Sequence, residues 1–308
     1  MERRWKNSPD HVPMNRIVSF LPAGTEMVHA LGAGGELVGR SHECDYPASV
    51  TRLPVVSRPA LDVDDVSPGA IDRAVADRLA SGDTLYTIDE VLLRDLKPDV
   101  ILTQNLCRVC APSGDELTRA VRKFDLRPEV LFLTPRNIAE IVENIVVVGR
   151  AIGRSAEAES LVREHEARLA KVRAAVAHAP TRRVVFLEWT EPLFCGGHWV
   201  PEMISLAGGE DPLGRPGEDS VRIDWSDVVN GSPELIIVSP CGYRLERAAE
   251  LARQLPTLPG ATVYAVDANA YFARPGPRVV EGVELLAHLF HPDLVPWSQT
   301  DRVWERIP

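Results

Sequence analysis

Short, unbroken runs of apolar residues recur along the whole chain and predict buried strands. The runs that we assign to strands are Ile17–Phe20, Leu37–Gly39, Val100–Thr103, Val130–Leu133, Val184–Leu187, Leu235–Ser239 and Val263–Val266. They lack the alternation of apolar and polar residues that marks a half-exposed sheet, and this is typical of parallel strands covered by helices on both faces. Because helical patterns separate the runs, the sequence predicts an α/β fold.

Two parts of the chain repeat one pattern. In each part an arginine precedes a strand, a helix containing Glu-Met follows, and a later proline and acidic residue precede a second strand. The matching segments are Arg16–Phe20 with Arg183–Leu187, Glu26–Gly32 with Glu202–Gly209, and Leu96–Leu102 with Gly231–Ile237. Two similar lobes imply a cleft between them, and such clefts are common sites for small ligands.

The segment between the repeats has a helical period only. Asn137 with Glu140 indicates a helix start, and apolar residues then recur at spacings of three and four as far as Ile152. A second stripe predicts a helix over Ser155–Ala177, which at about 1.5 Å per residue is about 35 Å long. We therefore expect an N-terminal arm at 1–14, one α/β lobe at 15–135, a helical connector at 136–180 and a second α/β lobe at 181–308.

Composition and charge narrow the classes of function. The chain has 308 residues, of which 45% are hydrophobic and 25% charged, and its formal net charge is −10. This charge argues against nucleic acid as a partner, since nucleic-acid binding needs a basic surface. Met1–Asp10 has no apolar core behind its charges, and no run approaches the roughly 20 apolar residues of a membrane span. We expect a cytoplasmic monomer without membrane insertion, or a periplasmic or cell-surface protein if the start is truncated.

Several of these motifs together resemble a known family. Arg16–Glu26, Leu96–Asp99 before a strand, the helical connector and Ala207–Gly209 resemble the helical-backbone (class III) substrate-binding proteins of ABC importers for cobalamin, haem and iron-siderophores. The resemblance covers about residues 15 to 292. It implies two Rossmann-like lobes with parallel sheets joined by a rigid helix, and a small-molecule ligand clamped between them with little lobe motion.

Within that family, Ser41–Pro47 and Gln104–Cys110 are most similar to cobalamin-binding proteins. The resemblance implies a bound corrinoid, haem or related metal chelate as the ligand, with no catalytic cofactor and no enzymatic activity. It also implies docking to an ABC permease through one acidic residue on each lobe, for which Glu90 and Asp227 are the nearest candidates. The simpler interpretation of both is as solvated carboxylates that complement a helix start.

Candidate ligand-binding residues gather after the predicted strands. Loops at the carboxyl ends of strands form the ligand crevice in doubly wound sheets. On such loops and in the first motif lie Pro22, Thr25, His42, Cys44, Tyr46, Gln104, Cys107, Cys110, Trp189, Cys195, His198, Trp199, Cys241, Tyr243 and Arg274. The large rings suit a flat macrocycle, and Arg274 suits either a carboxylate, phosphate or amide oxygen of a ligand or a salt bridge to the last helix.

The five cysteines leave three interpretations open. All follow predicted strands, so we expect their sulfurs to face the cleft rather than the cores. Cys107 and Cys110, with Cys44 and His42, could ligate a metal or an iron–sulfur cluster, or the CxxC pair could serve a thiol redox enzyme. Alternatively all five are packing residues, because free cysteine is usually a small buried hydrophobe.

Overall fold

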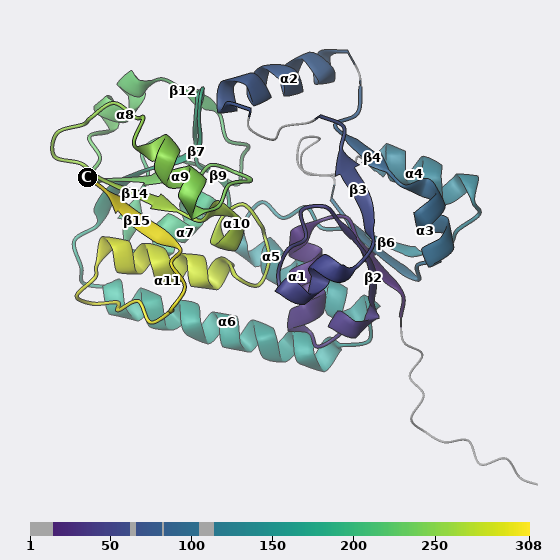
Figure 1. Ribbon diagram of the computed structural model, residues 1–308. Coiled ribbons are helices and arrows are strands. Elements are labelled where there is room, and N and C mark those ends of the chain that lie inside the picture. Colours follow the sequence, from purple (N-terminus) through teal and green to yellow (C-terminus); the bar gives the residue numbers. More distant parts are fainter. Residues whose placement is uncertain (1–14, 62–65, 82, 105–113) are drawn as a thin grey trace, which may run out of the picture.

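Two α/β lobes lie side by side on one long helix (Figure 1). The computed structural model describes residues 15–61, 66–81, 83–104 and 114–308. Within these ranges, no helix is long and apolar enough to cross a membrane. The predicted architecture of two lobes and a connecting helix is confirmed, and the bounds of its elements follow.

The first lobe is built on a six-stranded sheet in the order β4-β3-β2-β1-β5-β6. All neighbours in this sheet are parallel except β4, which runs antiparallel to β3 at the edge. Its elements are β1 (Ile17–Ser19), α1 (Pro22–Ala30), η1 (Gly34–Glu36), β2 (Leu37–Ser41), η2 (Ala48–Arg52), β3 (Val55–Pro59), α2 (Pro68–Ala80), β4 (Tyr86–Ile88), α3 (Glu90–Leu96), β5 (Val100–Thr103), α4 (Gly114–Lys123) and β6 (Glu129–Phe132).

The second lobe has a mixed sheet in the order β12-β8-β7-β13-β14-β15, with β10 also paired to β7. The central strands β7, β13 and β14 are parallel, whereas β8, β12 and β15 pair antiparallel toward the edges. Its elements are β7 (Arg182–Thr190), β8 (Leu193–Cys195), β9 (Gly197–His198), α7 (Val200–Leu206), β10 (Gly209–Glu210), β11 (Arg215–Pro216), β12 (Arg222–Ile223), α8 (Trp225–Gly231), β13 (Leu235–Val238), α9 (Leu245–Ala252), β14 (Thr262–Val266), α10 (Ala268–Tyr271), α11 (Val279–Phe290) and β15 (Trp304–Ile307).

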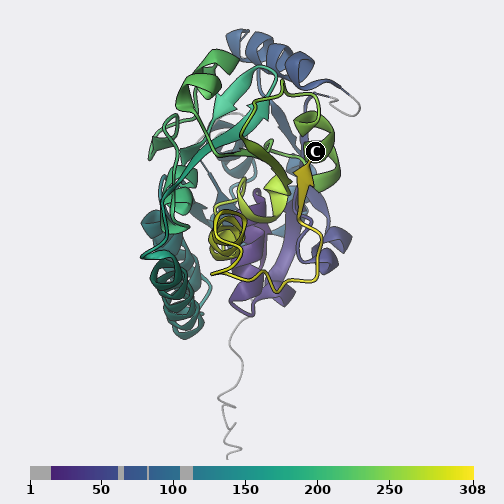
Figure 2. The ribbon, with the colours of Figure 1, turned by 90° about the vertical axis from the view of Figure 1, so that its left-hand side faces the viewer.

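Two helices form the connector, α5 (Ile138–Ala151) and α6 (Ser155–Val176). The side chain of Asn137 caps α5 by accepting a hydrogen bond from the Glu140 amide at 2.9 Å, as the sequence predicted. Helix α5 packs against α1 of the first lobe and against α6. Helix α6 runs beneath both lobes beside α11, and Figure 2 looks nearly along its axis.

One hydrophobic core passes from lobe to lobe along this connector. Alternate strand residues point to opposite faces, so Val184 and Phe186 of β7 join the shared core while Val185 and Leu187 face a core private to the second lobe. The same shared core contains Ile17 of β1 and residues of α5, α6 and α11. Closely packed interiors resist deformation, so the shared core makes the joint between the lobes stiff.

Hydrogen bonds confirm the internal repeat. Arg16 Nε donates to the carbonyl of Leu96 at 2.7 Å, and its amide donates to the Asp99 carboxylate at 2.9 Å. In the second lobe Arg183 makes the matching pair, with the carbonyl of Gly231 at 3.2 Å and the Glu234 carboxylate at 3.2 Å. The residues that end α3 and α8, Lys97 and Ser232, share a left-handed backbone with φ of 44° and 45°. The repeated sequence therefore builds the same helix-to-strand junction twice.

Candidate functional site

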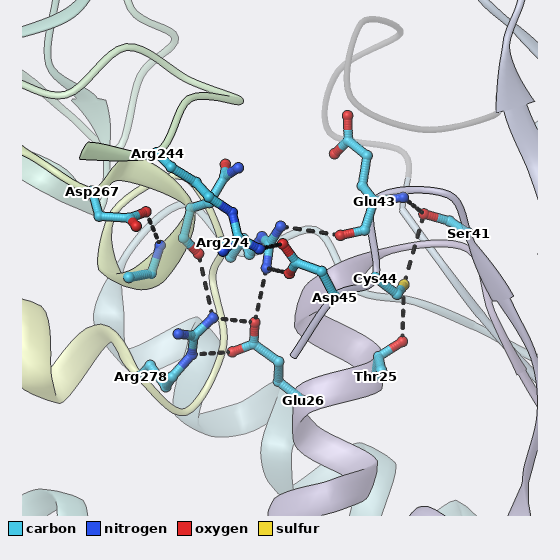
Figure 3. Close-up of polar contacts among 12 residues, drawn as sticks. Thr25, Glu26, Ser41, Glu43, Cys44, Asp45, Arg244, Asp267, Arg274 and Arg278 are labelled. Atoms are coloured by element: carbon cyan, nitrogen blue, oxygen red, sulfur yellow. Dashed lines mark hydrogen bonds and ion pairs between the residues drawn. The ribbon is translucent and has the colours of Figure 1, made fainter. Parts of the chain in front are cut away.

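Five charged residues at the junction of the lobes form what we call the interlobe network: Glu26, Asp45, Arg244, Arg274 and Arg278 (Figure 3). Glu26 lies on α1, and Asp45 follows β2 in the first lobe. The three arginines come from the second lobe, on the loops that precede α9 and α11. The network therefore joins segments more than 190 residues apart in sequence.

Glu26 is the buried centre of the network. Its side chain is 3% exposed, and it accepts hydrogen bonds from Arg278 Nε at 2.8 Å and Nη2 at 2.6 Å. Arg274 Nη1 approaches the same carboxylate at 3.4 Å. A two-point contact between a guanidinium and a carboxylate is among the strongest charge-assisted hydrogen bonds in proteins. It fixes α1 against the start of α11.

Asp45 pairs with both Arg274 and Arg244. One oxygen accepts from Arg274 at 2.6 Å, and the other makes a close ion pair with Arg244. Burial alone would raise the pKa of Asp45, but the hydrogen bonds and charges of Arg274 and Arg244 outweigh it and hold that pKa below its ordinary value. The carboxylate is therefore ionised at neutral pH and neutralises the arginines beside it.

Aromatic rings flank the network. The Arg278 guanidinium lies 3.9 Å from the centre of the Tyr46 ring, which is 48% exposed. At the ends of β7 and β13, Trp189 and Tyr243 stack with ring centres 5.6 Å apart and planes 19° apart. Each ring is close in sequence to a residue that meets the first lobe: Glu191 lies against Gly69, and Arg244 pairs with Asp45. The stacked pair is a flat apolar surface at the junction of the lobes.

Two cysteines contradict the prediction that all five sulfurs face the cleft. Cys44 and Cys195 are both fully buried, and Cys195 lies inside strand β8 rather than on a loop. The Thr25 hydroxyl donates to the Cys44 sulfur at 3.0 Å. Burial raises the pKa of both thiols, so they stay protonated and unsuited to ligate a metal. Cys241 is exposed on the loop after β13, as predicted.

The remaining part of the metal hypothesis finds no support in the described residues. Among them, no group of three or more His, Cys, Asp and Glu side chains could hold a metal ion. The His42 ring lies 3.2 Å from the carbonyl of Ser57, and burial lowers the pKa of His42. Cys107 and Cys110 lie outside the described residues.

Other predicted residues have structural contacts. Pro22 and Thr25 are buried in α1, and Gln104 is buried after β5. Trp199 is buried and donates its indole N–H to the carbonyl of Phe272 at 2.9 Å. His198 pairs with the exposed Asp219 at 3.1 Å. Arg274 makes the salt bridge that the sequence allowed, but to the opposite lobe rather than to the last helix.

The two acidic residues proposed for permease docking both have local partners. Glu90 begins α3 and forms an ion pair with Lys123. Asp227 completes a capping box at the start of α8, where its carboxylate accepts from the Asp224 amide at 2.8 Å. These contacts are those of helix-start carboxylates.

A cavity of about 350 Å³ separates the interlobe network from the connector. Glu26 and Tyr46 line it from the first lobe, His165 and Arg168 from α6, and Arg278 from the second lobe. Burial, and then the charge of Arg168, lower the pKa of His165 to about 4. This cavity is at the lower end of the sizes of small-molecule sites.

The sequence did not identify four members of the network. Glu26, Asp45, Arg244 and Arg278 were absent from the predicted ligand set because their partners are far away in sequence. Local signals existed: Asp45 lies inside the Ser41–Pro47 motif, and Arg278 ends the Pro-Gly-Pro-Arg turn after Arg274.

Comparisons with known proteins cover almost the whole chain. The family described as periplasmic binding protein matches residues 17–262. The vitamin B12-binding protein of Vibrio vulnificus (strain CMCP6) is 21% identical over 281 residues, which are 90% of each chain. An uncharacterized ABC transporter substrate-binding lipoprotein of Bacillus subtilis (strain 168) is 23% identical over 289 residues, 90% of this chain and 80% of the relative.

Solved structures share the fold. The crystal structure of a periplasmic heme-binding protein from Pseudomonas aeruginosa superposes with a TM-score of 0.70 at 18% identity, covering 96% of this chain and 98% of the other. The periplasmic and lipoprotein descriptions of these relatives contradict the expectation of a cytoplasmic location, which was wrong. That expectation rested on the composition of Met1–Asp10 and on the lack of a long apolar run in the sequence.

Proposed function

Since this chain belongs to the periplasmic binding protein family, we propose that it is the substrate-binding component of an ABC importer and holds one corrinoid between its two lobes. The vitamin B12-binding relative matches 90% of this chain, and so both lobes, which supports a ligand held between the lobes; its name supports a corrinoid as that ligand. The protein works by binding and presenting its ligand, and no chemical step is assigned to it.

The stacked pair of Trp189 and Tyr243 carries the proposal. Its rings are nearly parallel; Trp189 lies near the carboxyl end of β7 and Tyr243 on the loop that follows β13, the edge where α/β sheets bind ligands. Offset stacked rings present a broad apolar face, and the face of a corrin ring is likewise flat and largely apolar. Glu191 and Arg244, which are close in sequence to the two rings, contact Gly69 and Asp45 of the first lobe.

The connector limits how far the two lobes can move apart when the ligand binds. A single helix and a continuous core join the lobes, so a wide hinge opening would break packed contacts. We expect the free and bound forms to differ by a small rotation of the lobes, with the interlobe network holding the junction in both.

Isothermal titration calorimetry with dicyanocobinamide, cyanocobalamin and haemin tests the proposal. We expect saturable binding of one corrinoid per chain, and we expect Trp189→Ala to weaken it by about tenfold or more, as loss of a large aromatic contact does. Trp225→Ala is the matched control, since Trp225 begins α8 and packs against the core private to the second lobe. Failure of both corrinoids to bind the wild-type protein would refute the proposal.

A further inference from the structure

We infer that Asp45 selects the charge of the ligand. By occupying Arg244 and Arg274 with its own carboxylate, Asp45 makes the junction of the lobes favour corrinoids whose side chains are amides over tetrapyrroles that carry free carboxylates. This inference rests on the proposed function and adds the chemical class of the substrate to it.

Arginines on ligand-facing loops would ordinarily recruit acidic ligands. The guanidinium group offers a planar fork of N–H donors that matches a carboxylate. Arg244 and Arg274 both precede helices of the second lobe and reach across to the first. With no internal partner, they would form a site for carboxylate-bearing ligands.

The protein supplies those partners itself. Arg274 is 7% exposed and donates to Asp45, to Glu26 and to the backbone carbonyl of Glu43, the last at 3.0 Å. Arg278 donates hydrogen bonds from Nε and Nη2 to the two carboxylate oxygens of Glu26. Arg244, the most exposed of the three, is paired to Asp45. Each of the three arginines therefore already has a carboxylate partner from the opposite lobe.

Further carboxylates lie close to the three arginines. Asp267 caps α10 close enough to all three arginines for their charges to lower its pKa, although burial raises the pKa above its ordinary value overall. Glu43 is next to Asp45 and its side chain is 45% exposed. The chain as a whole carries a formal charge of −10. A ligand carboxylate at this place would find each arginine already paired with a carboxylate of the protein, and it would be repelled by the exposed carboxylates nearby.

Such a carboxylate would have to displace Asp45 or remain unpaired. Displacement leaves a half-buried Asp45 without its arginines, and an unpaired charge at a partly buried site is strongly unfavourable. Amide side chains avoid both costs because they are neutral and can hydrogen-bond to the carboxylates without displacing an arginine. Amide-bearing corrinoids, neutral or cationic overall, therefore fit this junction.

Two corrinoids that share the same corrin ring but differ in their side chains test the inference. Dicyanocobinamide carries amides, whereas dicyanocobyrinic acid carries free carboxylates. We expect the wild-type protein to bind dicyanocobinamide at least about tenfold more tightly, the difference expected for one charge-assisted contact. In Asp45→Asn, which removes the carboxylate that pairs with Arg244 and Arg274, the ratio of the two affinities should shift about tenfold toward dicyanocobyrinic acid.

Glu43→Gln is the matched control. It changes the net charge by the same amount, on the same loop, without removing a carboxylate from an arginine. Equal affinity of the wild-type protein for the two corrinoids would overturn the inference without using a variant, and so would an equal shift toward the acid in Glu43→Gln and Asp45→Asn. If the wild-type protein binds neither corrinoid, the proposed function fails and this inference with it; binding of both with equal strength refutes the inference alone.

Discussion

The replacement Glu26→Gln tests how far the interlobe network holds the two lobes together. The substitution keeps the size of the side chain but removes its charge. Glu26 is buried, and its carboxylate accepts hydrogen bonds from both Nε and Nη2 of Arg278. Without it, Arg278 at 17% exposure loses its carboxylate partner and keeps the carbonyl of Asn269, while Arg274 keeps Asp45 and the carbonyl of Glu43.

The expected loss follows from the burial of these charges. Removing one partner of a buried ion pair costs about 3–5 kcal/mol, because the other charge stays buried without compensation. An unfolding entropy of about 2.1 cal/mol/K per residue gives a 308-residue chain about 0.65 kcal/mol/K at the transition. A loss of about 3–5 kcal/mol therefore lowers Tm by about 5–8 °C if both lobes unfold together, as their shared core predicts.

Differential scanning calorimetry provides the measurement, and Glu218→Gln provides the control. Glu218 pairs with Arg215 at 3.5 Å, but both side chains are at least half exposed, so the same chemical change there should cost less than about 1 kcal/mol. A fall in Tm for Glu26→Gln no larger than that of Glu218→Gln would refute the view that the network stabilises the junction.

Three further predictions concern the connector and the thiols. Ala167→Pro, at an exposed position inside α6, should destabilise the protein by about 3 kcal/mol and increase the radius of gyration in small-angle scattering, whereas Ala167→Gly should leave the radius unchanged. Burial lowers the pKa of His165 to about 4, so the unfolded chain binds one proton more than the folded chain as pH falls from about 6.5 to 4. The free energy of unfolding from urea titrations should therefore fall less over this range in His165→Gln than in the wild-type protein. Iodoacetamide should modify Cys241 in the native protein while sparing Cys44 and Cys195, and rapid modification of either buried thiol, seen by peptide mass spectrometry, would contradict their assignment as packing residues.

Local patterns in the sequence were sufficient to predict the fold. Strands such as Val184–Leu187 are buried on both faces, so an unbroken apolar run identifies them without knowledge of their neighbours. The long helix was predicted over Ser155–Ala177 and observed over Ser155–Val176, because its apolar stripe and preceding glycine are also local signals. The strand Leu193–Cys195 was missed because three residues following a tight turn show no distinguishable period.

The candidate site was predicted less well because its contacts are tertiary. Glu26 and Arg278 meet across 252 positions, and no spacing rule connects them. The position of Cys44 after a predicted strand indicated an exposed sulfur, yet packing against Thr25 buries it. Trp189 and Tyr243 were both named as pocket rings, and they stack on each other. Their contact depends on the parallel pairing of β7 with β13. The sequence predicted parallel sheets but not which strands are neighbours.

The most direct test of corrinoid binding is a competition in which the protein selects its own ligand. The purified chain is incubated with equimolar cyanocobalamin and haemin, separated from free ligand by gel filtration, and examined by absorbance and mass spectrometry of the protein peak. The proposed function and the pairing of Asp45 with Arg244 and Arg274 predict one corrinoid per chain and little haem. A protein peak that carries haem, or that carries neither ligand, would contradict the proposal.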